Sequence, residues 1–362
     1  MKRPLVVERG SARYRALMAG GLFLLVALIL WGSGLAPFEL GQVTRVMIFA
    51  IAITGLNLAT GYVGMLSVGH SAFFGLGAYT TGILVVSYDW QAFAAIPVAF
   101  VVCLVAGLLV GLPALRIRGL YLAMVTLAFA VAFPELVAHF SDLTGGSSGL
   151  MIRRADLTPP AWSGFTLGQK DLWLYWLTVA LLIATVALIA ALVRSRYGMA
   201  LAAVRENEIA ASASGVNIAV VKTTMFGLSG AVTGVAGALF AMYMGSLFAE
   251  GSFTLLAGIT LLIGLVIGGE RTIAGPVVGA VVVVYVPYLT AEVGAGQAAS
   301  VLFAISLLAV IFLAPSGAVG GMTTLTRKFV VLAPRGRPKP PAPPAPDALP
   351  ARSDATDAAL SS

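Results

Sequence analysis

The most prominent pattern in the chain is a series of long apolar runs separated by short polar segments. The runs lie at about 17–36, 43–62, 71–88, 93–115, 119–140, 172–193, 219–244, 253–269, 273–291 and 298–314. An α-helix needs roughly 20 apolar residues to cross the hydrocarbon core of a bilayer. Continuous runs of this length exclude a membrane β-barrel, whose strands alternate between apolar and polar positions. The pattern therefore predicts an all-α polytopic membrane protein with about ten transmembrane helices.

Composition agrees with this fold class. The chain is 59% hydrophobic and 10% charged, and its mean hydropathy is +0.97, whereas soluble domains are about 25% charged. The basic segment 1–16 and the first apolar run together resemble a signal peptide. That run is longer than a typical signal-peptide core, and no small-residue cleavage motif precedes Pro37. We therefore expect it to be retained as the first span.

The positions of lysine and arginine predict the orientation of the spans. If the N-terminus is cytoplasmic, all but four of the 22 Lys and Arg residues fall on cytoplasmic segments; the four are Arg45, Arg153, Arg154 and Lys170. Cytoplasmic loops carry the excess of positive residues in membrane proteins, and an odd number of spans would spoil this alternation. We therefore expect both termini in the cytoplasm and a permease domain over residues 17–315.

Three segments outside the spans have distinct characters. Residues 1–16 form a basic cytoplasmic tail, and residues 327–362 form a Pro/Ala-rich tail that should be disordered in the cytoplasm. The proline content of the second tail leaves a partner-binding role open beside a passive one. The loop 141–171 contains TGGSSGL and the pair Pro159–Pro160, which favours an external cap or vestibule.

Motifs for catalysis and nucleotide binding are missing from the sequence. It has no G-x-x-x-x-G-K-[ST], no G-x-S-x-G and no H-E-x-x-H, so we expect no catalytic residue and no enzyme activity. One cysteine, Cys103, and two histidines, His70 and His139, are too few for a metal site. Glu135 and His139, one helical turn apart, leave open a proton relay or a helix end reached by water. No span carries an acid near its middle, so the energy for transport should come from another polypeptide.

Glycines predict how the helices pack. Four spans contain G-x-x-x-G, formed by Gly107 and Gly111, Gly230 and Gly234, Gly264 and Gly268, and Gly275 and Gly279. In lipid, helices associate by close approach of small residues, so these motifs predict tight contacts within a bundle.

The segment 61–82, GYVGMLSVGHSAFFGLGAYTTG, should interrupt a helix, because six glycines and several polar groups lie at membrane depth. One interpretation is a re-entrant or discontinuous element within 61–77, beside a substrate path, since broken helices are tolerated where protein or water satisfies the backbone. The other is that Ser67 or Ser71 caps the following helix while His70 bonds a backbone carbonyl. The two interpretations are compatible.

The loop 194–222 holds the main cluster of charges between two apolar runs; they are Arg194, Arg196, Arg205, Glu206, Glu208 and Lys222. Its alanine content predicts a helix over 201–214, in which Arg205 and Glu208 pair at i,i+3. Gly215 is placed to end that helix in the left-handed conformation. A plain connector would need none of these features, so we expect a docking surface.

Five blocks, in this order, resemble the LivM-type permease family of branched-chain amino acid ABC importers. They are GLNLATGYVGMLSVGHSAFFGLGAYT, RIRGLYLAMVTLAFA, LTGGSSGL, SRYGMALAAVRENEIAASASGVN and GGERTIAGPVVGA, within about residues 45–315. The resemblance implies a type II-like ABC importer permease in a bacterial inner membrane. It also implies a homologous sister permease in a heterodimer, two ATP-binding subunits that hold the ATP, and a periplasmic solute-binding protein. It implies no cofactor in this chain and no nucleic acid.

In this family the loop 194–222 would be the coupling element that docks on an ATP-binding subunit. The residues that would form it are Arg205, Glu206, Asn207, Glu208, Ala210, Ala211 and Gly215. The sequence departs from the pattern because Ile209 stands where a glutamate is expected directly before the alanines. The Ile-x-Leu-Pro ending is absent, and Arg271 stands where the family has a small residue.

Two other functions remain open at this point. The same fold would serve a permease for urea or short amides, and a different class, an autonomous channel or facilitator, would need the loop only as a connector. An apolar amino acid requires an apolar path with a few hydroxyl and amide groups. The candidates for such positions are Asn57, Ser67, His70 and Thr126.

Overall fold

A computed structural model describes residues 5–8, 30, 32–112, 120–293, 317 and 330–333. The long helices are α2 (Pro37–Leu56), α3 (His70–Tyr88), α4 (Ala95–Gly111), α5 (Leu120–His139), α7 (Lys170–Arg194), α10 (Ile218–Met244), α12 (Leu255–Gly268) and α13 (Gly275–Val293). The short helices are α6 (Ser141–Thr144), α8 (Arg196–Glu206), α9 (Glu208–Ala213) and α11 (Ala249–Ser252). A π-helical segment, η1 (Asn57–Val63), continues α2, and 3₁₀ turns occur at η2 (Ala92–Ala94), η4 (Gly146–Ser148), η5 (Arg154–Leu157), η6 (Ala161–Ser163) and η7 (Leu167–Gln169).

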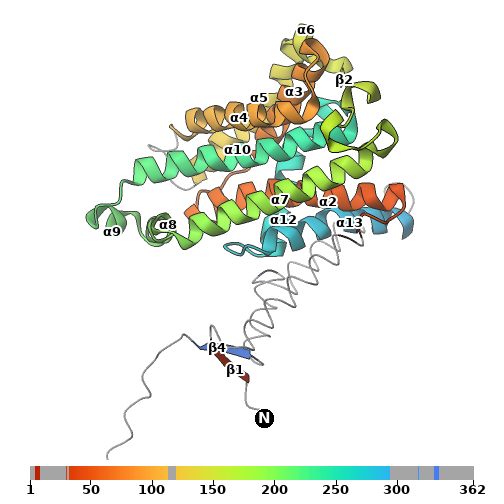
Figure 1. The fold of residues 1–362 in the computed structure, drawn as a ribbon. Helices are drawn as coiled ribbons and strands as arrows, with labels where there is room; N and C mark the ends of the chain where they lie inside the picture. The colour runs from red at the N-terminus through yellow and green to blue at the C-terminus, as the bar shows by residue number, and fades with distance from the viewer. Residues whose placement is uncertain are drawn as a thin grey trace, which may run out of the picture. The chain divides into compact units, whose positions relative to one another are not determined.

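Four short strands complete the fold: β1 (Leu5–Glu8), β2 (Leu150–Met151), β3 (Ser246–Leu247) and β4 (Val330–Ala333). The chain divides into two compact units, residues 1–22 with 327–362, and residues 23–326. In the first unit β1 pairs in parallel with β4 (Figure 1). In the second unit β2 pairs antiparallel with β3, with Leu150 opposite Leu247.

Seven helices within the described residues are long and apolar enough to cross a membrane. They are Pro37–Val63, His70–Tyr88, Ala92–Gly111, Tyr121–His139, Lys170–Arg194, Ile218–Met244 and Ala249–Gly268, and Gly275–Thr290 is a shorter apolar helix. A helix therefore lies at every predicted run between 43 and 291. The predicted spans 17–36 and 298–314 lie outside the described residues.

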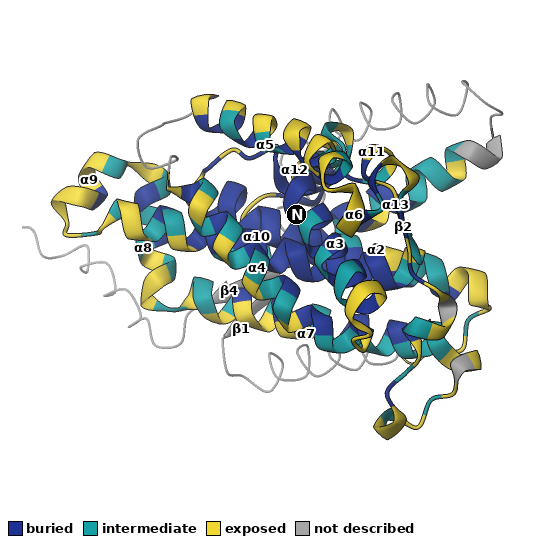
Figure 2. Ribbon diagram, turned by 90° about the horizontal axis from the view of Figure 1, so that it is seen from above, coloured by how far each residue is buried: buried dark blue, intermediate teal, exposed yellow. Residues whose placement is uncertain are grey.

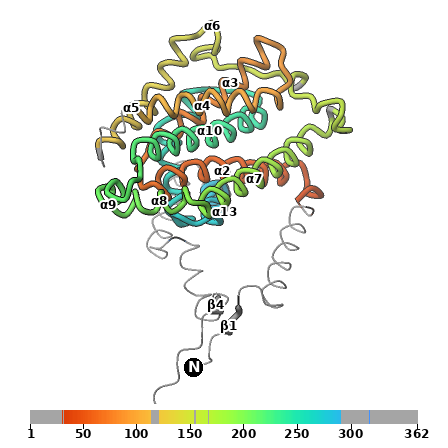
Figure 3. The backbone as a smooth tube through the Cα atoms, turned by 60° about the vertical axis from the view of Figure 1, so that its left-hand side comes forward, coloured from red at the N-terminus to blue at the C-terminus, as the bar shows by residue number. Residues whose placement is uncertain are grey.

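Helices α2 and α10 form the centre of the second unit. In the apolar windows of these spans, 89% of the α2 residues and 94% of the α10 residues are buried, against 28% for α4 and 22% for α7. The two central helices are dark blue in Figure 2, and the outer helices expose yellow faces. Helix α10 packs against α2, α3 and α4 (Figure 3). The outer face of α4 carries exposed apolar side chains such as Val101 and Val105, as expected of helices in contact with lipid.

Glycines bring the central helices together at backbone distance. A Cβ atom at Gly77 of α3 would meet the carbonyl group of Gly234 in α10, and one at Gly107 of α4 would lie 2.8 Å from the Cα of Gly227. A Cβ at Gly279 of α13 would meet the carbonyl of Gly264 in α12. The prediction that small-residue motifs pack the bundle is confirmed at these contacts.

The glycine-rich segment separates two complete helices. The α2–η1 helix ends at Val63, the backbone turns left-handed at Gly64 (φ 84°), and helix α3 begins at His70. The helices on either side have 27 and 19 residues, and each is long enough to cross a bilayer. The break at 64–69 therefore lies between two helices of spanning length.

Candidate functional site

The loop 194–222 forms two short helices that meet at a bend. Asn207 has an extended backbone (φ −158°, ψ 108°), and its Oδ1 accepts hydrogen bonds from the backbone N–H groups of Ile209 (3.0 Å) and Ala210 (3.1 Å). Asparagine is a preferred N-cap because its side chain satisfies N–H groups that lack a helical partner. The predicted single helix over 201–214 is therefore wrong. Gly215, with φ 83°, is left-handed as predicted.

Two ion pairs fix this α8–α9 element to the rest of the unit. Arg205 Nη2 lies 2.9 Å from Glu270 Oε2, in the loop between α12 and α13, and Nη1 donates to the Thr60 carbonyl in η1 (3.1 Å). Lys222 Nζ, buried at the start of α10, lies 2.6 Å from Glu208 Oε1. The expected pairing of Arg205 with Glu208 is wrong, because the bend at Asn207 turns each side chain to a different partner.

One side of the α8–α9 element is buried and the other is open. Leu201, Val204 and Ala211 are buried and belong to an apolar cluster with residues of η1 and α10. Glu206, Asn207, Ala210 and Gly215 are exposed, and Arg205 and Glu208 are partly buried. Ile209 is 75% exposed and borders a shallow cavity of about 410 Å³ that Glu208, Ser212, Ala213 and Ile218 also line. Figures 1 and 2 place α9 at one end of the helices, opposite α6 and β2.

Asn57 connects the central helix to the loop between α12 and α13. Its Nδ2 donates to the Thr272 carbonyl (3.0 Å), and its Oδ1 accepts from the Arg271 backbone N–H (3.1 Å). Arg271 has φ 60°, a left-handed conformation that glycine adopts at little cost. The hydrogen bond from the Arg271 N–H to Asn57 helps to hold that conformation.

His70 forms a hydrogen-bonded chain with two serines. Ser67 Oγ lies 2.8 Å from His70 Nδ1, and Ser229 Oγ of α10 lies 2.6 Å from Nε2. The single proton of the Ser229 hydroxyl is donated to the Gly55 carbonyl (2.6 Å), so Ser229 must accept from Nε2–H, and Nδ1 accepts from Ser67. The chain joins α2, α3 and α10.

The structure corrects the capping interpretation of this segment. His70 bonds hydroxyl groups, not a backbone carbonyl, and the N-cap of α3 is Gly69, without a side-chain cap. Thr126 Oγ1 of α5 accepts from the Val68 N–H (3.2 Å) and donates to the Ala123 carbonyl (3.0 Å). Asn57, Ser67, His70 and Thr126 are all buried around the break at 64–69.

Sequence reasoning missed the partners of these residues. Glu270, Thr272 and Ser229 lie 65, 215 and 159 positions away from Arg205, Asn57 and His70. The charged pair Glu270–Arg271 in an apolar region was the one signal that pointed to this loop. No local pattern links residues so far apart.

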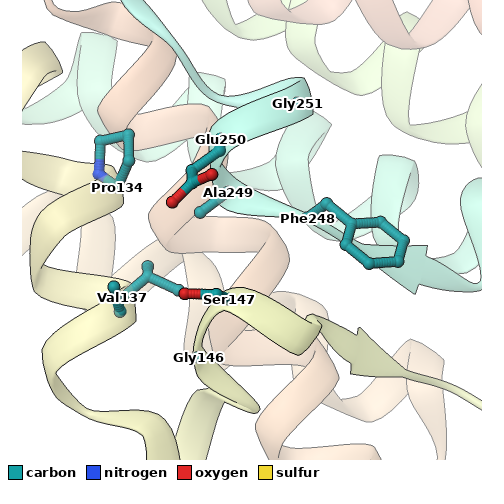
Figure 4. A pocket seen from close by; sticks show the side chains of 9 residues that line it. Pro134, Val137, Gly146, Ser147, Phe248, Ala249, Glu250 and Gly251 are labelled. Carbon is teal, nitrogen blue, oxygen red and sulfur yellow. The ribbon is translucent and has the colours of Figure 1, made fainter.

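A cavity of about 250 Å³ lies at the opposite end of the helices, between the end of α5, the α6–η4 loop and α11 (Figure 4). It is lined by Pro134, Val137, Ala138, Gly146, Ser147, Phe248, Ala249, Glu250 and Gly251. Glu135 and His139, the candidates for a proton relay, are both exposed and line a separate open cavity of about 550 Å³ on α5.

Comparison of the sequence with known proteins identifies a family to which it is similar. Residues 40–313 match the family model described as "Branched-chain amino acid transport system / permease component". The high-affinity branched-chain amino acid transport system permease protein LivM of Salmonella typhimurium (strain LT2) is 32% identical over 279 residues, and LivM of Escherichia coli (strain K12) is 31% identical over the same length. The alignments cover 72% of this chain and 65% of each relative. No solved structure matches.

The family match extends from α2 past the end of α13, so it includes the α8–α9 element, the His70 chain and the Asn57 contacts. It agrees with a bundle of several spanning helices and with the absence of a nucleotide-binding motif in the sequence. The chain therefore belongs to the family of multi-pass membrane permease components of branched-chain amino acid transport systems.

Proposed function

We propose that this chain is the permease subunit of an ATP-driven importer that carries branched-chain amino acids across the bacterial inner membrane. Family membership and the named activity of its relatives support this. In this proposal the chain crosses the membrane ten times, with both termini in the cytoplasm, and pairs with a homologous sister permease. A periplasmic solute-binding protein delivers the substrate. Two ATP-binding subunits supply the energy, and this chain carries out no chemistry.

The observation that carries the proposal is the construction of the α8–α9 element. Its buried side packs on the bundle and its two ion pairs hold it there, yet Ile209 is 75% exposed beside a shallow cavity. In the proposed orientation this surface faces the cytoplasm, where no lipid covers it. An exposed apolar side chain at the edge of a shallow cavity can serve as an anchor of a protein–protein interface. We assign this surface, with Glu206, Asn207, Ala210 and Gly215, to the ATP-binding subunit.

The contacts of Arg205 supply a route by which docking can move the spans. Its guanidinium bonds both the Thr60 carbonyl in η1 and Glu270 between α12 and α13, and Asn57 joins the same two regions. A displacement of α8 would therefore act on α2, α12 and α13 together. When the helices around 64–69 part, Asn57, Ser67, His70 and Thr126 would face the translocation path.

The substitution Ile209→Arg tests the assignment of the docking surface. Interface anchors contribute about 2 kcal/mol or more, so the affinity for the ATP-binding subunits is expected to fall by about tenfold or more. The measurements are co-purification of the assembled transporter and ATP-dependent leucine uptake in proteoliposomes. Met151→Arg is the matched control, since Met151 is 76% exposed but lies in β2 at the opposite end of the bundle.

Two results would contradict the proposal. In one, Ile209→Arg and Met151→Arg retain the ATP-binding subunits equally well. In the other, this chain alone transports leucine into vesicles without ATP-binding subunits, as an autonomous facilitator would.

A further inference from the structure

The cavity at the end of α5 has walls of two kinds. Pro134, Val137 and Ala249 give it apolar surface, while Glu250 and Ser147 bring a carboxylate and a hydroxyl group from opposite sides (Figure 4). Glu250 makes no hydrogen bond or ion pair with the part of the chain that the structure describes. An apolar wall with a few convergent polar groups is the usual composition of a small-molecule site.

The loop that covers this cavity is fixed by specific contacts. The Thr144 hydroxyl donates to the Val137 carbonyl at the end of α5 (2.6 Å) and accepts from the Gly146 N–H (3.1 Å). Gly149 (φ 79°) packs so closely on the start of α11 that a Cβ there would lie 2.6 Å from Cδ1 of the N-cap residue, Phe248. The β2–β3 pairing ties the same loop to α11 through Leu150 and Leu247. The end of α5, the α6–η4 loop and α11 are therefore held together without a ligand.

The volume limits what the cavity can hold. It measures about 250 Å³, whereas pockets for drug-sized ligands are about 300–1,000 Å³. The cavity is large enough for a ligand of the size of a free amino acid. It is too small for a peptide segment or a lipid.

We propose that this cavity is an entry subsite for the zwitterionic form of an apolar amino acid. The Glu250 carboxylate accepts hydrogen bonds from the α-ammonium group, and the Ser147 hydroxyl donates to the α-carboxylate. The branched side chain lies against Pro134, Val137 and Ala249. These groups recognise both charges and the apolar side chain, so urea and short amides, which lack them, bind poorly. The inference deepens the proposed function and rests on it, because that function places this end of the bundle on the outer side.

A cysteine introduced into the cavity tests the subsite without requiring transport. Cys103 is the only cysteine of the chain and is buried, so Gly251→Cys supplies the one accessible thiol of this subunit. Gly251 lines the cavity, and a Cβ there would meet only Phe248 Cβ, at 3.8 Å. In the assembled transporter, made with partner subunits whose cysteines have been replaced, leucine is expected to slow modification of this thiol by a membrane-impermeant methanethiosulfonate. Isocaproate, which lacks the ammonium group, should need an at least tenfold higher concentration, because a hydrogen bond to a charged group is lost.

Glu250→Gln in the Gly251→Cys background isolates the carboxylate. Glu250 is exposed, so this change preserves folding, and half-protection by leucine should require about tenfold more ligand. His139→Cys, in the separate cavity on α5, is the control, whose modification leucine should not slow. The inference is overturned if leucine fails to protect Gly251→Cys, if it protects His139→Cys equally, or if Glu250→Gln leaves the half-protection concentration unchanged.

Uptake by the unmodified transporter separates this inference from the proposed function. Loss of ATP-dependent uptake of leucine, isoleucine and valine by the wild-type assembly overturns the function. Specific protection of Gly251→Cys would still support an amino acid site. Normal uptake without protection leaves the function standing and overturns the subsite.

Discussion

Lys222 and Glu208 form an ion pair across the end of the bundle, and the two partners have different environments. The Lys222 side chain is 8% exposed and the Glu208 side chain 29% exposed. A buried ammonium group is rarely tolerated without a partner. Glu208 thus supplies the charge that lets Lys222 lie inside the start of α10, and in return Lys222 holds α9 against the bundle.

Replacing Glu208 should lower the free energy of unfolding more than replacing Lys222. Glu208→Gln leaves a buried ammonium unpaired and should lower the free energy of unfolding by about 3 kcal/mol. Lys222→Met leaves a carboxylate that solvent can reach and should cost less. The double variant should be more stable than Glu208→Gln alone. Thermal unfolding of the detergent-solubilised protein measures all three.

The pair Arg153–Asp156 is the control for this cycle, because its cation, Arg153, has a side chain that is 78% exposed. The Asp156 carboxylate raises the pKa of Arg153 through a hydrogen bond and its charge, but surface pairs contribute little to stability. Arg153→Gln should leave the midpoint unchanged. Equal midpoints for Glu208→Gln and the wild type would contradict the role given to the Lys222–Glu208 pair.

The α8–α9 bend shows how neighbouring elements override local helix propensity. The alanine-rich run 201–214 has the composition of one helix, yet Asn207 also has a strong preference for N-cap positions. The contacts of Arg205 with Glu270 and of Lys222 with Glu208 favour two separate helices. Both partners come from elsewhere in the chain, so composition alone could not decide between the alternatives.

The spans themselves were predictable, whereas the polar contacts inside them were not. Each apolar run between 43 and 291 appears as a helix, because its length and hydropathy are local properties. The contacts of His70 with Ser229 and of Asn57 with Thr272 join residues more than 150 positions apart, so they depend on which helices become neighbours. Gly215 was predictable because only its own backbone conformation decides its role.

The packing of α3 on α10 should be sensitive to any side chain at Gly77. A Cβ there meets the Gly234 backbone, which cannot move aside, so Gly77→Val should separate the helices. The expected cost is about 3 kcal/mol, in the upper range for overpacking, with loss of uptake. Gly168→Val is the control, because a Cβ at Gly168 meets only Thr166 Oγ1, at 3.9 Å. An unchanged unfolding midpoint for Gly77→Val would show that α3 and α10 are not in contact.

At the scale of the whole molecule, the proposed orientation places the two ends of the bundle on opposite sides of the membrane, which reporter fusions can distinguish. Alkaline phosphatase fused after residue 168 should be active, because that loop is assigned to the outer side. Green fluorescent protein fused after residue 215 or after the C-terminus should fluoresce, because both points are assigned to the cytoplasm. The positive-inside distribution is the physical reason. Active phosphatase after residue 215 would reverse the orientation, and a non-fluorescent C-terminal fusion would contradict the count of ten spans.

The near-complete burial of α10 has a consequence for how the protein is made. Its 94% buried window contains Ser229 and Thr233, and the same helix begins near Lys222, so it suits protein surroundings better than lipid. Its main neighbours are α2, α3 and α4, all of which leave the ribosome earlier. These three helices can thus already be in place when α10 emerges and packs against them. Chains that lack α2, α3 and α4 should therefore expose α10 to quality-control proteases. Chains that are cut after α10 should not.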